Sequence, residues 1–188
     1  MGIFTADIWS VEQQTTHQRS DQLAVEEPLE IKLTHGPAAD RKTQTLAITM
    51  RTPGNDFNLV MGFLFTEGII GASEEVQHIQ HAPHISSEEA ENTVIVELSP
   101  KVQLDWEKLN RHFYTSSSCG VCGKGSIEMV QMHTCYFPIP GRPQIKRDQL
   151  FVLPQYMREA QTVFASTGGI HAAGLFSPQG ELMAVRED

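Results

Sequence analysis

The sequence predicts a mixed fold of the α/β or α+β class, in which strands both precede and follow helices. Two patterns indicate it: apolar residues that alternate with polar ones, and apolar residues that recur at intervals of three and four. Of the 188 residues, 40% are hydrophobic and 20% are charged, which is typical of globular proteins. We expect a β-rich subdomain with one helix over 1–112 and a second domain over 113–188.

Two strands are predicted on either side of a polar loop over 35–43. The first eighteen or so residues are polar and weakly periodic, which fits an arm or an edge strand. Apolar and polar residues then alternate in two segments, which predicts two half-buried strands. Their apolar residues are Leu29, Ile31 and Leu33 in the first segment and Leu46, Ile48 and Met50 in the second.

A helix is predicted after Pro53-Gly54, because Asn55 or Asp56 can cap it. Its apolar residues follow helical spacing and are Phe57, Val60, Met61, Leu64 and Phe65. Gly68 would end this helix, because glycine adopts the left-handed conformation that commonly follows the last helical turn.

The run over 74–91 is rich in acidic residues and histidine, and we interpret it as a solvated connector. His78, His81 and His84 are spaced at three, as on one helical face, and could form a metal cluster. No cysteine or carboxylate is placed with them, so the sequence does not favour a metal there. Residues 93–98 predict another strand.

The second half predicts two helices. The first begins near Ser126, and a stiff proline-rich loop follows over 138–143. The second starts at Pro154, since proline is favoured at the first helical position, and stops before Thr167-Gly168-Gly169. Its inward residues would be Met157, Ala160, Val163 and Phe164.

A hairpin is predicted to close the chain. Residues 170–176 and 182–185 are apolar segments on either side of the turn Ser177-Pro178-Gln179-Gly180. The last residues, from Val185 to Asp188, carry no capping or turn signal of their own.

The net charge of −9 is concentrated in residues 1–112, whereas residues 113–188 carry equal numbers of acidic and basic side chains. Nucleic-acid binding needs a basic surface, so this charge distribution argues against it. No segment is apolar and long enough to span a membrane, and the amino terminus lacks an export signal. The sequence therefore predicts a cytoplasmic protein.

The candidate functional site is the motif Cys119-Gly120-Val121-Cys122-Gly123. Glycines between and after the cysteines allow a tight turn whose backbone N–H groups can point at sulfur. Lys124 and the positive end of a following helix would favour the thiolate, which is the nucleophilic form of cysteine. In a reducing compartment, this pattern indicates sulfur, redox or metal chemistry rather than a structural disulfide.

Spacing alone leaves three kinds of site open. A zinc knuckle would add Cys135 and either His133 or His171, although the chain has no second cysteine pair. A thioredoxin-like redox site has the same spacing but normally an aromatic and proline flank, and here the flank is serine. A sulfur carrier needs an accessible nucleophilic cysteine. Cys135 also fits a small core position, and His171, on an apparently buried strand, fits either a core or a site role.

Six segments in order carry a resemblance to a known family. They are Val25 to Ile31, Met50 to Gly54, Gly62 to Ile70, the cysteine motif, Thr167 to Ala173, and Val185 to Asp188. Together they resemble the FdhD/NarQ family of formate dehydrogenase accessory proteins, and the resemblance covers nearly the whole chain from residue 23 onward.

The resemblance implies a sulfurtransferase. Family members are understood to accept sulfur from a cysteine desulfurase and to carry it as a cysteine persulfide. The acceptor is the bis-molybdopterin guanine dinucleotide form of the molybdenum cofactor, before this cofactor enters formate dehydrogenase. By position, Cys119 would carry the persulfide and Cys122 would assist its transfer, with no metal or tightly bound cofactor. The supporting residues would be Gly120, Gly123, Lys124 and His171.

The resemblance also implies that the second domain is a cytidine-deaminase-like three-layer domain. Zinc deaminases carry His-x-Glu, whereas Ala173 stands two residues after His171, so deamination is not expected. Family members usually continue beyond the Val-Arg-Glu-Asp segment. We therefore expect a C-terminally truncated chain with an incomplete second domain, and cofactor-binding residues that lie beyond Asp188.

A function of another class stays open beside the sulfurtransferase. The acidic first half could instead make the protein a non-catalytic chaperone or scaffold that binds formate dehydrogenase or its cofactor. The resemblance leaves open which dehydrogenase is served and whether the protein forms a homodimer.

Overall fold

The structure, a computed structural model of the chain, describes residues 2–83, 91–104, 106, 109 and 139–188. The chain divides into two compact units. Unit 1 comprises Met1–Glu26, Thr52–Gly54 and Pro138–Asp188, and unit 2 comprises Glu27–Arg51 and Asn55–Phe137. The predicted domain boundary near residue 112 falls outside the described residues and stays a prediction.

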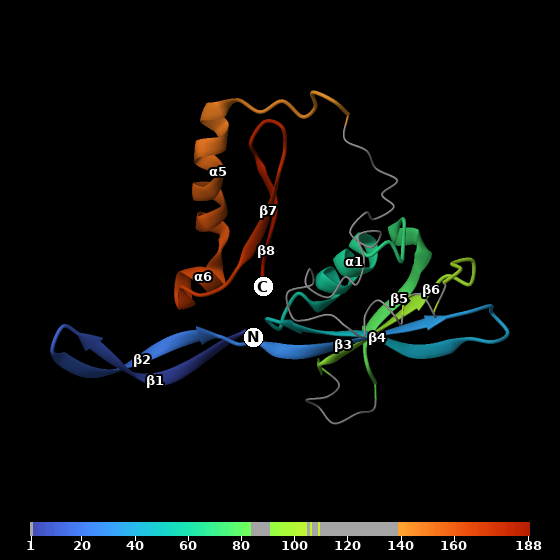
Figure 1. Cartoon of the computed structure of the whole chain (residues 1–188), viewed down its shortest axis with the longest axis horizontal. Coiled ribbons are helices and arrows are strands. Elements are labelled where there is room, and N and C mark those ends of the chain that lie inside the picture. Colours follow the sequence, from blue (N-terminus) through green and yellow to red (C-terminus); the bar gives the residue numbers. More distant parts are fainter. Residues whose placement is uncertain (1, 84–90, 105, 107–108, 110–138) are drawn as a thin grey trace. The chain divides into compact units, whose positions relative to one another are not determined.

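Unit 2 contains a four-stranded sheet, and helix α1 (Asp56–Thr66) lies on its face (Figure 1). In spatial order the strands are β4 (Lys42–Arg51), β3 (Glu27–His35), β6 (Thr93–Leu98) and β5 (Val76–His81). The pair β3–β6 is parallel, whereas β3–β4 and β5–β6 are antiparallel. The predicted strands around 29–33, 46–50 and 93–98 are confirmed, as is the mixed fold class.

The core of unit 2 lies between this sheet and helix α1 (Asp56–Thr66). Val60 and Leu64, one helical turn apart, are both 0% exposed. The predicted helix is confirmed, and Gly68 follows it with a left-handed φ of +66°. Its buried face is narrower than predicted, because Phe57 and Phe65 remain 39% and 46% exposed. The core side chains are Leu29, Ile31, Leu33, Leu46, Val60, Leu64, Ile69, Ile70, Val94, Val96 and Leu98.

A β-bulge in β4 changes which side chains face the core. Ile31 pairs with Ala47 and Lys32 pairs with Thr45, so Leu46 is the extra residue. An extra residue reverses the alternation for the rest of the strand. Leu46 is therefore buried while Ile48 is 64% exposed, which corrects the prediction that the two share a face.

The run over 74–91 is not only a connector. Ser73–Glu75 form a 3₁₀ turn, η1, and Val76–His81 form β5 at the edge of the sheet. His78 and His81 therefore lie on a strand rather than on one face of a helix, and His84 is outside the described residues. Pairing with the buried strand β6 decides this conformation, and local composition does not reveal such pairing.

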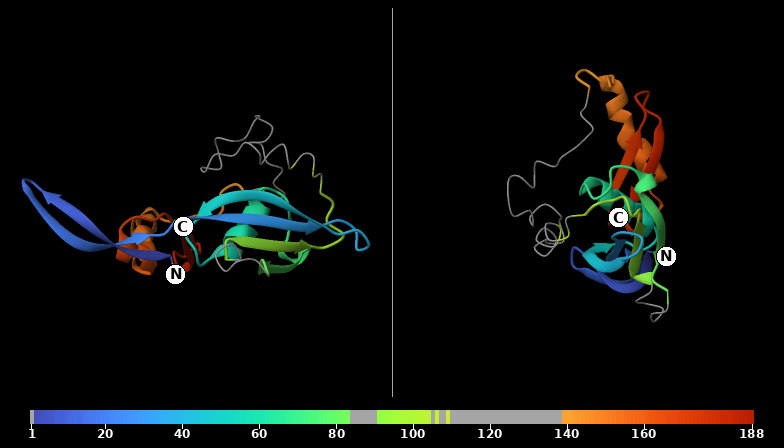
Figure 2. Two further views of the ribbon diagram at one scale, coloured as in Figure 1. Left: turned by 90° about the horizontal axis from the view of Figure 1, so that it is seen from below. Right: turned by 90° about the vertical axis from the view of Figure 1, so that its right-hand side faces the viewer.

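The described residues of unit 1 form two hairpins and two helices. The amino-terminal hairpin is drawn in blue in Figure 2. The predicted amino-terminal arm or edge strand is a long hairpin of β1 (Ile3–Glu12) and β2 (Thr15–Ala24). The predicted closing hairpin is confirmed as β7 (Ala172–Phe176) and β8 (Leu182–Glu187). All buried apolar side chains among the described residues belong to unit 2.

The helical segment of unit 1 differs from its prediction. Helix α5 spans Arg147–Ala160, so Pro154 lies inside it rather than at its start. Proline lacks the backbone N–H that would bond to the carbonyl of Leu150, four residues earlier, and Leu150 is 51% exposed. Gln161 breaks the helix, and α6 (Thr162–Thr167) follows and ends at Gly168. No helix in these described segments is long and apolar enough to cross a membrane.

Because of the bulge, we expect alanine substitutions at two nearby apolar residues of β4 to lower the free energy of unfolding by different amounts. Leu46→Ala should lower the free energy of unfolding by about 2–5 kcal/mol, because it empties a buried position. Ile48→Ala should change it by about 0.5 kcal/mol or less, because that side chain is mostly in water. Urea unfolding of both variants measures the difference, and equal losses would contradict the reversed alternation.

Glu30 predicts a pH dependence of stability. Burial raises the pKa of its carboxyl group, but hydrogen bonds from Thr45, Lys32 and Thr93 and the Lys32 charge outweigh it and hold the pKa below its ordinary value. A carboxyl group whose pKa is lower in the folded state stabilises that state above the unfolded pKa. The stabilisation by Glu30 is therefore lost as the pH falls through the pKa that its carboxyl group has in the folded protein.

We therefore expect Glu30→Gln to flatten the acid side of the stability profile, as measured by denaturant unfolding between neutral and acidic pH. Glu74→Gln makes the same chemical change on an exposed residue and should leave the profile as it is. An unchanged profile in Glu30→Gln would rule out this role for Glu30.

Candidate functional site

The predicted sulfur site lies outside the described residues. This applies to Cys119, Gly120, Cys122, Gly123 and Lys124. It applies equally to Cys135 and His133, the further ligands of a zinc knuckle. Their roles stay predictions. Within the described segments, no group of three or more histidine, cysteine or acidic residues is placed to hold a metal ion.

His171 is described, and it is exposed rather than buried as the sequence suggested. It follows the turn at Gly168, whose φ of +67° needs a residue that tolerates the left-handed conformation. The backbone N–H of His171 donates to the Asp188 carbonyl at 3.1 Å, and the Asp188 N–H donates back at 3.0 Å. This pair extends the β7–β8 hairpin by one step and leaves the imidazole open to solvent.

The acidic residues at the end of the chain bind backbone N–H groups. The carboxylate of Glu187 accepts hydrogen bonds from the N–H groups of Val163 at 3.0 Å and Phe164 at 2.7 Å. It thereby caps the first turn of α6, where helix N–H groups lack partners. The carboxylate of Asp188 accepts a hydrogen bond of 2.6 Å from the N–H of Thr52. The sequence carried no local sign of these bonds, because the partners are 23 or more residues away.

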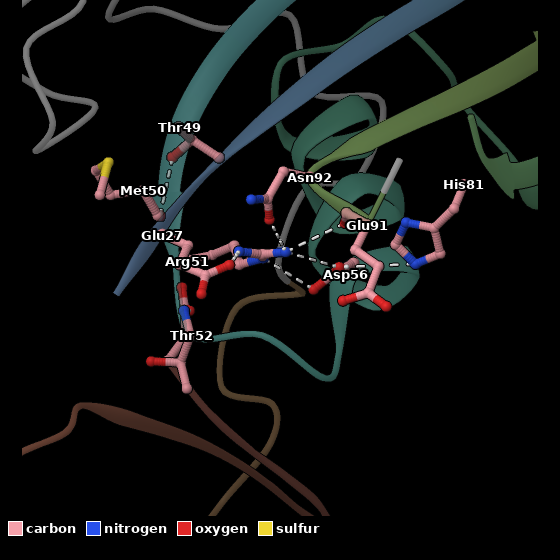
Figure 3. Close-up of polar contacts among 10 residues, drawn as sticks. Glu27, Thr49, Met50, Arg51, Thr52, Asp56, His81, Glu91 and Asn92 are labelled. Atoms are coloured by element: carbon pink, nitrogen blue, oxygen red, sulfur yellow. Dashed lines mark hydrogen bonds and ion pairs between the residues drawn. The ribbon is translucent and has the colours of Figure 1, made fainter. Parts of the chain in front are cut away.

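Among the described residues of unit 2, an extensive polar cluster surrounds Arg51, the last residue of β4 (Figure 3). Its guanidinium donates to both carboxylate oxygens of Asp56, at 3.2 and 3.3 Å. It also donates to the Glu27 carboxylate at 3.4 Å, the Asn92 side-chain oxygen at 2.8 Å and the Glu91 carbonyl at 3.3 Å. Arg51 is 3% exposed and Asp56 is 8% exposed, so their charges are paired almost out of contact with water.

His81 lies at the outer side of this cluster (Figure 3). Its Nε2 is 3.7 Å from Asp56 Oδ2, which is too long for a hydrogen bond but close enough for an ion pair when the imidazole is protonated. Its ring packs on Phe57, with the two centroids 4.9 Å apart. The Nδ1 atom is buried without a hydrogen-bond partner.

The geometry of the Arg51 cluster indicates a structural role rather than a ligand site. Protein acceptors surround the guanidinium, and almost none of it is exposed to a ligand. Sequence reasoning missed the cluster, because regular alternation would have placed Arg51 on the solvent side, opposite Leu46. The bulge turns it inward. One sequence feature could have indicated the cluster: an arginine at the end of a predicted strand, a few residues before a helix that begins with an aspartate.

Comparison with known proteins identifies what the chain resembles. Residues 24–188 match the model of the FdhD/NarQ family. A relative from Mycolicibacterium paratuberculosis, named sulfur carrier protein FdhD, is 43% identical over 90% of this chain and 60% of its own length. Relatives of the same name from Streptomyces avermitilis and Sulfurisphaera tokodaii are 44% and 35% identical. They are matched over 58% and 65% of their lengths, and over 90% and 100% of this chain.

A solved structure shares the fold. It comes from Desulfotalea psychrophila, bears the name formate dehydrogenase accessory protein, and matches with a TM-score of 0.66 at 15% identity. The match covers 100% of this chain and 63% of that one. The chain thus spans about three fifths of the length of the proteins that it resembles.

The Glu187 cap predicts a local effect on α6. Glu187→Gln keeps the size but replaces one acceptor oxygen and the negative charge, so we expect the helix start to lose about 1 kcal/mol. Amide hydrogen exchange at Val163 and Phe164 measures the loss. Glu181→Gln, an exposed residue of the β7–β8 turn, should leave these two amides unchanged. Unchanged exchange in Glu187→Gln would show that the carboxylate is not the cap.

Proposed function

The chain belongs to the FdhD/NarQ family, and on this premise we propose that it is a sulfurtransferase that carries sulfur as a persulfide on Cys119. The sulfur would come from a cysteine desulfurase. It would go to the molybdenum cofactor, in its bis-molybdopterin guanine dinucleotide form, before the cofactor enters formate dehydrogenase.

One observation carries the proposal: a cysteine pair, Cys119 and Cys122, lies within the matched residues 24–188 of a chain whose relatives are named sulfur carriers. A sulfur carrier needs a nucleophilic thiolate with room around it. The glycines at 120, 123 and 125 supply small neighbours, and Lys124 supplies a positive charge that favours the thiolate.

Loading would be a thiol exchange that moves one neutral sulfur atom. The Cys119 thiolate attacks the terminal sulfur of the desulfurase persulfide, and the bond between this sulfur and the desulfurase cysteine breaks. Cys119 then carries the persulfide, and the desulfurase cysteine leaves as a thiolate. The sulfur keeps its oxidation state, so this step needs no oxidant or reductant.

Release would use Cys122. Its thiolate attacks the Cys119 sulfur atom, a Cys119–Cys122 disulfide forms, and the terminal sulfur leaves as hydrosulfide. The two cysteines lose two electrons, and the departing sulfur gains them. A cellular dithiol then reduces the disulfide and returns both cysteines to thiols. The spacing of two intervening residues is the spacing that thioredoxin-like proteins use for such a reversible disulfide.

The partners follow from names and chemistry. Formate dehydrogenase is proposed because the solved structure with the same fold bears the name of its accessory protein. The desulfurase and the molybdenum cofactor are proposed from the persulfide chemistry and the family resemblance. His171 is proposed as a supporting residue because it is exposed and follows a glycine turn.

The proposal predicts a one-sulfur adduct. After incubation with a cysteine desulfurase, cysteine and no reductant, mass spectrometry should find one added sulfur on the Cys119 peptide. Cys119→Ala should abolish the adduct. Cys122→Ala should keep it and accumulate it, because the resolving thiol is gone, and Cys135→Ala should behave as the parent protein.

Two outcomes would oppose this assignment. A Cys119→Ala variant that still restores formate dehydrogenase activity to a strain without the accessory protein would favour the scaffold function. Stoichiometric zinc in the purified protein would favour the zinc knuckle, because metal-bound cysteines cannot carry a persulfide.

A further inference from the structure

The chain that follows β6 is held on the core of unit 2. Its side chains Val102, Leu104, Trp106 and Leu109 are partly buried and pack against the core residues of that unit. The turn at the start of this segment is closed by the N–H of Val102, which donates to the Ser99 carbonyl at 3.0 Å. A large aromatic side chain buries more area than an aliphatic one, so Trp106 is an important part of this attachment.

Trp106 stacks on His35, the last residue of β3. The ring centroids are 4.7 Å apart, and the ring planes are inclined by only 12°. The imidazole is also bound to β4, because its Nε2 lies 2.9 Å from the side-chain oxygen of Gln44. An amide oxygen can only accept a hydrogen bond, so Nε2 carries the hydrogen and donates it. Nδ1 is therefore the atom of the neutral ring that takes up a further proton.

A proton on Nδ1 strengthens the stack and keeps the hydrogen bond. The charged imidazolium is attracted by the electron-rich face of an indole ring, which is a cation–π interaction. Both nitrogens of the charged ring are donors, so the Nε2–H can still bind the oxygen of Gln44. The two contacts of His35 thus respond differently: the one with Gln44 stays, and the one with Trp106 becomes stronger.

Few of the described charges lie on the same face of the sheet as His35. Lys42 is its partner on β4, and the Lys42 ammonium lies 3.7 Å from the Asp40 carboxylate, which partly offsets its charge. The Arg41 guanidinium donates to three backbone carbonyls. Glu97 on β6 pairs with the residue before His35, so its side chain lies on the other face. Three charged residues of the segment itself lie outside the described residues, namely Asp105, Glu107 and Lys108.

We propose that His35 and Trp106 form a pH-sensitive latch, which holds the segment after β6 on unit 2 more firmly when the imidazole is protonated. Histidine side chains take up their proton between about pH 8 and about pH 5, so the latch responds close to neutral pH. Both residues and the core that they contact belong to unit 2. The inference does not depend on the proposed sulfur chemistry.

The fluorescence of Trp106 in the full chain tests the latch. The chain has two tryptophans, and Trp9→Phe removes the other one, which is 67% exposed. Acrylamide is an uncharged quencher, so its quenching rate constant reports how accessible the indole is. This constant is taken from the Stern–Volmer slope and the fluorescence lifetime, because a charged imidazole can itself shorten the lifetime. We expect it to fall roughly twofold between about pH 8 and about pH 5.5.

Two variants in the Trp9→Phe background separate His35 from other titrating groups. His35→Gln keeps an amide that can donate to Gln44 but has no titratable nitrogen, so its rate constant should not change with pH. His78→Gln makes the same change at an exposed histidine of β5 and should keep the pH dependence of the parent protein.

A rate constant that stays the same or rises toward acidic pH in the parent protein would overturn the latch. An equal fall in His35→Gln, or the loss of the fall in His78→Gln, would overturn it as well. Should His35→Gln fail to fold, His35→Phe keeps a stacked ring without a titratable nitrogen. A fall in His35→Phe as large as in the parent protein would then refute the role of His35.

Discussion

The bulge at Leu46 is the constraint on which the architecture of unit 2 depends. Without it, Ile48 and Met50 would face the core, and Arg51 would point to solvent. With it, Ala47, Thr49 and Arg51 lie on the inner side, as their pairing with Ile31, Leu29 and Glu27 requires. A buried guanidinium is tolerated only with a full set of acceptors, and the start of α1 supplies the most important of them in Asp56. The position of α1 is therefore tied to a register shift within β4.

Local patterns predicted most elements correctly, and they failed where a distant partner decides the conformation. Leu29, Ile31 and Leu33 alternate along β3, and Val60 and Leu64 are one turn apart, so periodicity alone identifies a strand and a helix. The bulge depends on how β4 pairs with β3, and β5 exists because β6 offers it an edge. Proline is favoured at the first helical position, which predicts a helix start at Pro154, but α5 begins at Arg147 and has Pro154 in its interior, and none of its residues is buried.

The same difference between local patterns and distant partners applies to the candidate site. The cysteine motif could be found from sequence, because two cysteines separated by glycine and valine carry their chemistry in their spacing. The roles of Glu187 and Asp188 could not, because a cap depends on what lies in space beside the carboxylate. The sequence shows no capping or turn signal at these residues, whereas in the structure Glu187 caps α6 and Asp188 accepts a hydrogen bond from the N–H of Thr52. The sequence places His171 on a buried strand, whereas it is exposed, like Ala173 and Leu175, which lie two and four residues further along the same hairpin strand.

Stability alone does not explain a buried arginine at the strand end. Replacing a buried ion pair by apolar side chains of similar size often leaves a protein as stable or makes it more so. Apolar contacts, however, act without direction, and they would let the ends of β3, β4 and α1 slide over one another. Hydrogen bonds from one planar group fix both the distances and the directions of Glu27 and Asp56 relative to Arg51. An ionic cluster therefore suits the place where the ends of β3, β4 and α1 meet in unit 2, because directional bonds hold these three ends in fixed positions.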